Sequence, residues 1–114
     1  GMHYLRDKIG AEGPSGMIFK GRIETGKIAK IESRSQHTGE DLITTRILWL
    51  SGLEPGVNMG AGVDSYRRFI YIHGTHEEGL IGQPASHGCV RMNNQDVVEL
   101  FNQLPEKALV LIQE

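Results

Sequence analysis

Short apolar runs alternate with turns rich in glycine along most of this chain, which is the pattern of a mainly β protein. The runs expected to form strands are 3–9, 17–23, 28–31, 42–50, 68–73 and 108–112. Segment 25–27 is expected to turn the chain, and 32–41 to form a polar loop. Segment 108–112 is apolar enough to predict a strand buried on both faces.

One stretch near the C-terminus has helical periodicity. Apolar side chains three or four residues apart share one helix face: Val97, Leu100, Phe101 and Leu104. Asn93 is a favourable N-cap, and Asp96 falls near the positive end of the helix dipole. Pro105 is expected to end the helix. The sequence therefore predicts several strands and one short, late helix.

Length and charge narrow the function classes. A chain of 114 residues is expected to form a single domain, 1–114. Its net charge of −2 offers no basic surface for nucleic acid, so nucleic-acid binding is not expected. No run approaches the roughly 20 apolar residues of a membrane span. Residues 1–6 lack the apolar segment of a signal peptide, although a leader could have been removed.

The chain's single cysteine lies in the stretch Ser86-His87-Gly88-Cys89. His73 lies upstream, at the end of an apolar run. A cysteine with a separately placed histidine is a nucleophile-and-base arrangement. His73 could take the thiol proton, hold an imidazolium beside the sulfur and return the proton to a leaving group. Gly88 allows a tight turn that would aim the backbone N–H groups of Gly88 and Cys89 at an oxyanion.

Other interpretations of these residues stay open. Cys89 could be a buried structural cysteine. A zinc site could use four ligands, His73, His76, His87 and Cys89. The Cys-x-x-Cys pairs common in structural zinc sites are absent from the sequence, and no metal site is predicted. His3 and His37 lie in unpatterned polar contexts and are expected to be solvated.

His73-Gly74-Thr75, a glycine-rich loop and the block from Ser86 to Met92 together resemble the signature of the L,D-transpeptidase catalytic domain, the YkuD family. Members of this family remodel bacterial peptidoglycan. The resemblance implies a β-sandwich or open barrel with one short helix after the catalytic cysteine. Family domains usually open with further strands, so N-terminal strands are expected to be missing from this chain. The sheet edge left exposed would favour pairing with another copy.

The resemblance also implies residue roles. Cys89 would be the nucleophile and His73 the base, with the Gly74 carbonyl orienting the His73 ring. Backbone N–H groups of His87, Gly88 and Cys89 would form the oxyanion hole. Ser86 and His87 would shape the turn and could contact substrate.

Arg91 has two open interpretations. It could bind a carboxylate of the substrate, because a guanidinium pairs well with that group. It could equally brace the loop through backbone carbonyls.

The implied function is a peptidoglycan L,D-transpeptidase that acts on stem tetrapeptides through a thioester. It would form 3→3 cross-links or attach another amine acceptor. The alternatives are an L,D-carboxypeptidase, with water as the acceptor, and a catalytically silent envelope-binding module. Peptidoglycan stem peptides would be the partners, and the periplasm or cell envelope the location. No cofactor is expected, since acyl transfer through a thioester needs neither redox chemistry nor a nucleotide.

Overall fold

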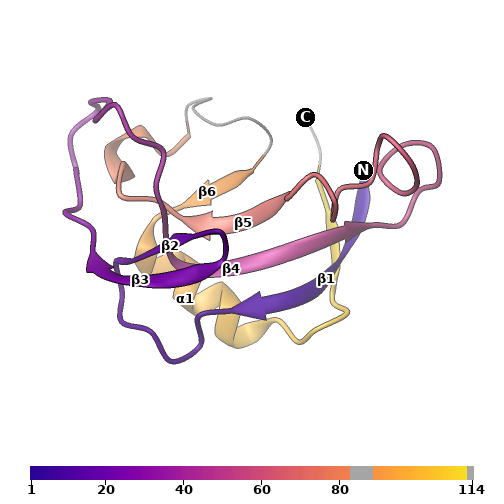
Figure 1. Ribbon diagram of the computed structural model, residues 1–114, viewed down its shortest axis with the longest axis horizontal. Coiled ribbons are helices and arrows are strands. Elements are labelled where there is room, and N and C mark those ends of the chain that lie inside the picture. Colours follow the sequence, from indigo (N-terminus) through magenta and orange to yellow (C-terminus); the bar gives the residue numbers. More distant parts are fainter. Residues whose placement is uncertain (83–88, 113–114) are drawn as a thin grey trace.

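The computed structural model describes residues 1–82 and 89–112 (Figure 1). Within these ranges the chain is mainly β, with 38 residues in strands and one α-helix, which confirms the expected fold class. The strands are β1 (Met2–Ile9), β2 (Met17–Lys20), β3 (Ile23–Ile28), β4 (Ile43–Gly52), β5 (Tyr71–Gly74), β6 (Val90–Met92) and β7 (Leu109–Leu111). The helices are the 3₁₀ turn η1 (Glu78–Leu80) and α1 (Asn94–Gln103).

Strand β4 is the centre of the sheet. Its Ile, Thr, Leu and Trp content suits a strand with buried neighbours. β1 pairs antiparallel with β4 and carries β7 on its outer side, while β2 pairs with the start of β4 and carries β3. β5 pairs antiparallel with β4 and parallel with β6. The short strands β5 and β6 therefore bring segments around His73 and Cys89 side by side.

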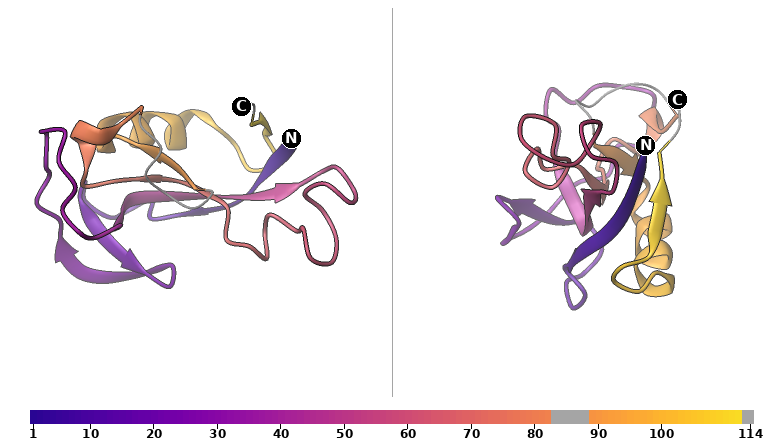
Figure 2. Two further views of the ribbon diagram at one scale, coloured as in Figure 1. Left: turned by 90° about the horizontal axis from the view of Figure 1, so that it is seen from above. Right: turned by 90° about the vertical axis from the view of Figure 1, so that its right-hand side faces the viewer.

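The two faces of the sheet carry separate apolar clusters. Helix α1 lies over one face, where it packs against β4 and β5 (Figure 2). The buried cluster on that face contains Leu5, Leu48, Leu50, Ile70, Ile72, Val97 and Phe101. Alternation along the strands sends the intervening side chains to the opposite face. The cluster there contains Met17, Phe19, Ile47 and Tyr71, with Trp49 and Cys89 packed against it.

The β2–β3 hairpin differs from the expected pattern. Its turn is formed by Gly21 and Arg22, which have φ values of 58° and 67°. Two successive positive φ values are typical of the two-residue turn that matches strand twist. The predicted strand 17–23 is confirmed for 17–20, but the chain turns at 21–22 instead of continuing. The predicted turn 25–27 was wrong, because these residues lie inside β3. Of the predicted strand 28–31, only Ile28 belongs to a strand.

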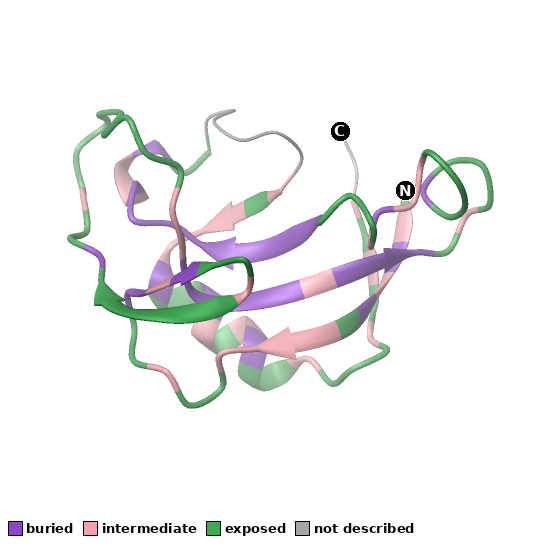
Figure 3. Ribbon diagram, in the orientation of Figure 1, coloured by how far each residue is buried: buried purple, intermediate pink, exposed green. Residues whose placement is uncertain are grey.

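Burial corrects two further expectations (Figure 3). β7 is an edge strand whose Leu109 and Leu111 side chains are 66% and 54% exposed, so the prediction of burial on both faces was wrong. His3 was expected to be solvated but is 5% exposed. Its ring bonds to the Gly1 carbonyl and the Ser65 hydroxyl, both at 2.9 Å. His37 is exposed, as expected.

The helix start follows its sequence signal. Asn93 is the N-cap, and its side chain accepts a hydrogen bond of 2.8 Å from the Asp96 backbone N–H. The capping prediction is confirmed. Among the described residues, no helix is long and apolar enough to cross a membrane.

Candidate active site

His73 is held inside β5 with a defined tautomer. It is 1% exposed, and its Nδ1 lies 2.6 Å from the Gly74 carbonyl oxygen. A carbonyl only accepts hydrogen bonds, so Nδ1 carries the proton and Nε2 keeps its lone pair. The contact implied between His73 and Gly74 is thus present, and the imidazole is arranged to accept a proton at Nε2.

Gly74 is required by the close approach of two neighbours. A β-carbon at this position would lie 2.6 Å from the Thr44 carbonyl oxygen and 2.7 Å from Asn94 Oδ1. Both distances are shorter than real side chains tolerate. Glycine therefore lets β5 pack against β4 and the start of α1 while its carbonyl holds His73.

Cys89 comes directly before β6, next to the strand that carries His73. The parallel register places Arg91 opposite His73. Because strand side chains alternate, Cys89 and His73 share the sheet face that points away from α1. Strand spacing and rise put their Cα atoms about 8 Å apart. The Cys89 thiol donates a hydrogen bond of 3.3 Å to the Phe69 carbonyl.

Burial favours the uncharged forms of both Cys89 and His73. It is the main cause that raises the pKa of Cys89, and the nearby Asp41 carboxylate adds to the rise. Burial is also the main cause that lowers the pKa of His73, while the Gly74 carbonyl opposes it. At neutral pH the thiol and the imidazole are therefore both uncharged. These directions favour an uncharged pair over the imidazolium expected beside the sulfur.

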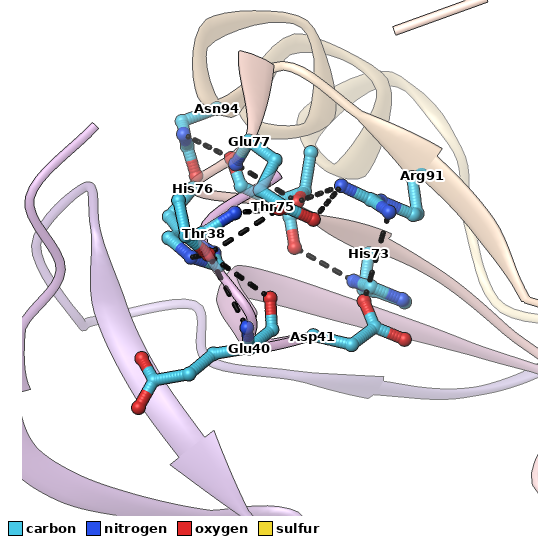
Figure 4. A network of polar contacts seen from close by, with 10 residues as sticks. Thr38, Glu40, Asp41, His73, Thr75, His76, Glu77, Arg91 and Asn94 are labelled. Carbon is cyan, nitrogen blue, oxygen red and sulfur yellow. Dashed lines mark hydrogen bonds and ion pairs between the residues drawn. The ribbon is translucent and has the colours of Figure 1, made fainter. Parts of the chain in front are cut away.

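The Arg91 guanidinium is engaged by neighbouring side chains (Figure 4). Its Nη2 donates to Glu77 Oε1 at 2.8 Å and to Thr75 Oγ1 at 2.9 Å, and its Nη1 lies 3.8 Å from Asp41 Oδ1. The side chains of Arg91 and Glu77 are only 8% and 4% exposed. These side-chain contacts favour the bracing interpretation. A substrate carboxylate would have to compete with Glu77.

Glu77 extends this network to the loop before β4. Its Oε2 accepts a hydrogen bond of 2.7 Å from the Thr38 backbone N–H. The Thr38 hydroxyl also bonds to His76 Nε2 at 2.7 Å. The chain Arg91–Glu77–Thr38 therefore ties the strand after Cys89 to a loop distant in sequence. A pocket of about 190 Å³ lies beside it, lined by His37, Gly39, Glu40, Asp41 and Glu77.

Replacing Glu77 by glutamine is expected to lower stability by about 2 kcal/mol at pH 7, because the buried Arg91 guanidinium keeps only the half-exposed Asp41 carboxylate, 3.8 Å away, as its counter-charge. The Thr38 N–H is the largest cause that lowers the pKa of Glu77 from its ordinary 4.5. A lowered folded-state pKa stabilises the fold above pH 4.5, and this contribution is lost as the pH falls through the folded-state pKa. The free energy of unfolding, measured in urea, should therefore fall more steeply on acidification for the wild type than for the variant.

The matched control for this experiment is Glu99→Gln on the exposed side of α1. It should leave the urea midpoint and its pH dependence unchanged. A Glu77→Gln protein with wild-type midpoints at pH 7 would contradict the bracing role.

Some predicted site residues lie outside the described ranges. Ser86, His87 and Gly88 belong to this group, so their turn and oxyanion-hole roles stay predictions. His87 was also one of the four suggested zinc ligands. Over residues 1–82 and 89–112, no group of three or more His, Cys, Asp or Glu side chains is arranged to hold a metal ion.

Asn94 is a structural residue that the sequence analysis missed. It is 4% exposed, and its Oδ1 accepts hydrogen bonds from the hydroxyls of Thr44 and Thr45. Its Nδ2 donates to the Thr75 carbonyl at 3.0 Å and to Glu78 Oε2 at 2.8 Å. Asn94 thereby fixes the backbone next to Gly74. The available signal was its place after the capping Asn93, since a polar residue in the first turn of a packed helix needs partners.

Fold and site together define a mainly β domain with a cysteine and a proton-accepting histidine on one face of its sheet. A family model described as the L,D-transpeptidase catalytic domain, YkuD, matches residues 1–112. The chain belongs to this family. No solved structure matched the chain.

Curated relatives match shorter segments. "Putative L,D-transpeptidase YqjB" of Bacillus subtilis is 47% identical over 45 residues, which is 40% of this chain and 26% of the relative. "Putative L,D-transpeptidase YkuD" of the same organism is 42% identical over 59 residues, which is 51% of this chain and 36% of the relative. "Probable L,D-transpeptidase YbiS" of Escherichia coli is 47% identical over 38 residues, which is 33% of this chain and 12% of the relative. The chain thus spans at most 36% of the length of these relatives.

Proposed function

We propose that this protein is a cysteine-dependent L,D-transpeptidase that acts on peptidoglycan stem tetrapeptides in the cell envelope. The observation that carries the proposal is the orientation of His73: its Nδ1 donates to the Gly74 carbonyl, which leaves Nε2 free to accept a proton on the face shared with Cys89. Family membership supports the reaction class and the substrate.

In the first half-reaction, Cys89 Sγ attacks the carbonyl carbon that joins the L-centre of diaminopimelate to the terminal D-Ala. His73 Nε2 accepts the thiol proton as the C–S bond forms, since the resting thiol is neutral. Backbone N–H groups of His87, Gly88 and Cys89 would receive the oxyanion. The C–N bond then breaks as His73 returns the proton to the amine. D-Ala departs, and the rest of the stem peptide stays attached to Cys89 as a thioester.

In the second half-reaction, an amine of a neighbouring stem attacks the thioester. His73 takes a proton from that amine and passes it to the departing sulfur, which regenerates the neutral pair. The product is a 3→3 cross-link. If water replaces the amine, the same steps release a trimmed stem, which is L,D-carboxypeptidase chemistry.

Incubation with a carbapenem is expected to add the drug's mass covalently to the intact wild-type protein, and Cys89→Ala should abolish the adduct. Intact-mass spectrometry measures both. Incubation with a purified disaccharide tetrapeptide then separates the acceptors, since cross-linking yields dimers and hydrolysis yields tripeptide stems. If the wild-type protein forms neither adduct nor product, although a thermal unfolding transition shows that it is folded, the result would instead support the silent binding module.

A further inference from the structure

Arg22 occupies a backbone conformation that an arginine rarely adopts. Its φ of 67° places it in the left-handed region, at the second central position of the β2–β3 turn. Glycine is the favoured residue there, because side chains with a β-carbon are strained at positive φ. The turn itself therefore does not account for an arginine, and a strained residue directs attention to what its side chain does.

The Arg22 side chain reaches back to three aromatic residues, Trp49, Phe69 and Tyr71, here named the aromatic platform. Its guanidinium carbon lies 4.8 Å from the Trp49 ring centroid and 4.9 Å from that of Phe69. Its Nη1 donates to the Tyr71 hydroxyl at 3.0 Å. Cation–π stacking and this hydrogen bond fix the orientation of the guanidinium.

The aromatic platform adjoins Cys89. Trp49 and Cys89 pack against the same cluster, of which Tyr71 is a member, on the sheet face that points away from α1. The Phe69 carbonyl accepts the hydrogen bond of the Cys89 thiol. Phe69 is 50% exposed and has a φ of 58°, so a second strained residue lies on the platform. Two of the four non-glycine residues with positive φ in the described ranges, Arg22 and Phe69, therefore meet at the aromatic platform.

The guanidinium of Arg22 has capacity for an anion. In the described ranges it makes one hydrogen bond to a protein group and no ion pair with a carboxylate. An arginine fork has five N–H donors and matches the two oxygens of a carboxylate. Arg22 is partly exposed, whereas Arg91 is buried against Glu77. Of these two arginines near Cys89, Arg22 is the one whose carboxylate partner is not already supplied by the chain.

We propose that Arg22, held on the aromatic platform, is the carboxylate-recognition residue of the active site. This inference rests on the proposed function, because the ligand is a carboxylate of the stem tetrapeptide. Two carboxylates have the same chemistry: that of the terminal D-Ala and that at the D-centre of diaminopimelate. Arg22 sets specificity by pairing with one of them while the scissile carbonyl lies at Cys89.

The test measures tetrapeptide binding by calorimetry in the Cys89→Ala protein, which separates binding from chemistry. Adding Arg22→Met, which removes the charge but keeps an unbranched side chain, should weaken binding about tenfold. Arg22→Gly also removes the guanidinium, but glycine suits the turn, so the hairpin should not be distorted. An equal loss of binding in both variants therefore shows that the guanidinium is responsible and not a distorted hairpin. The matched control is Arg6→Met: Arg6 stacks on the Tyr66 ring at 3.8 Å, from β1 on the other side of β4. It should change binding less than twofold.

Amidated peptides identify the carboxylate. Amidation of the carboxylate that Arg22 binds should weaken binding to the Cys89→Ala protein about tenfold. With that amide, the further substitution Arg22→Met should have no effect on binding. The inference is overturned if Arg22→Met binds like Arg6→Met, if neither amide removes the effect, or if the Cys89→Ala protein does not bind the tetrapeptide. Failure of the proposed function is read separately, as a Cys89-containing protein that forms no acyl-enzyme or product with the same peptide.

Discussion

Acylation of Cys89 by a carbapenem is expected to persist below pH 6.5, whereas its alkylation by iodoacetamide should become fast only above pH 9. The two reactions need different forms of the site. Acylation needs neutral His73, and burial lowers the pKa of His73 from its ordinary 6.5, so the neutral base survives at lower pH. Alkylation needs the thiolate, and burial raises the pKa of Cys89 from its ordinary 9.0, so the thiolate appears only at higher pH.

The measurement is the rate of each reaction between pH 5 and 10, followed by intact-mass spectrometry. His73→Ala should slow acylation by about 10²- to 10⁴-fold, as removal of a general base does, and should remove the acid limb of its profile. The same variant should change the alkylation profile little, because the thiol stays protonated in both proteins. Rapid, pH-independent alkylation of the wild type between pH 6 and 8 would instead indicate a thiolate–imidazolium pair.

Elements with local signals were predictable from the sequence, and those decided by tertiary partners were not. Helix α1 carries its own cap in Asn93 and its own apolar face, so its start was found. The β2–β3 turn was misplaced because Thr25-Gly26-Lys27 has turn composition, although the chain reverses at Gly21 and Arg22. The apolar composition of β7 could not reveal that the strand lies at a sheet edge, since edge position depends on the order of all strands.

The candidate site divides in the same way. Motif spacing was enough to suggest Cys89 and His73 as a pair. The sequence could not show that Glu77 forms an ion pair with Arg91 or that the Arg22 guanidinium lies over the Trp49 ring, because these contacts join distant segments. It also could not give the direction in which burial moves the two pKa values. That direction changes the expected mechanism from a preformed ion pair to proton transfer during attack.

Gly74→Ala is expected to lower the free energy of unfolding by about 3 kcal/mol and to slow acylation of the molecules that remain folded. Overpacking a core typically costs about 1–3 kcal/mol, and here the nearest atom is the Thr44 backbone carbonyl oxygen, 2.6 Å from the added β-carbon, which cannot move aside as a flexible side chain can. β5 must shift to relieve this overlap. The Gly74 carbonyl that holds His73 Nδ1 shifts with it, so the base loses its orientation.

Urea unfolding and the acylation rate per folded molecule test the two parts of this prediction. The matched control is Gly13→Ala, where the nearest atom to the added β-carbon is the Glu24 carboxylate oxygen at 2.8 Å, at the end of a flexible side chain that can move away. It should cost less than about 1 kcal/mol. If Gly74→Ala is as stable as Gly13→Ala, the close packing of β5 on β4 is wrong. If it is unstable but acylates normally when folded, the Gly74 carbonyl does not position His73, because distortion of this one contact is what links the substitution to the chemistry.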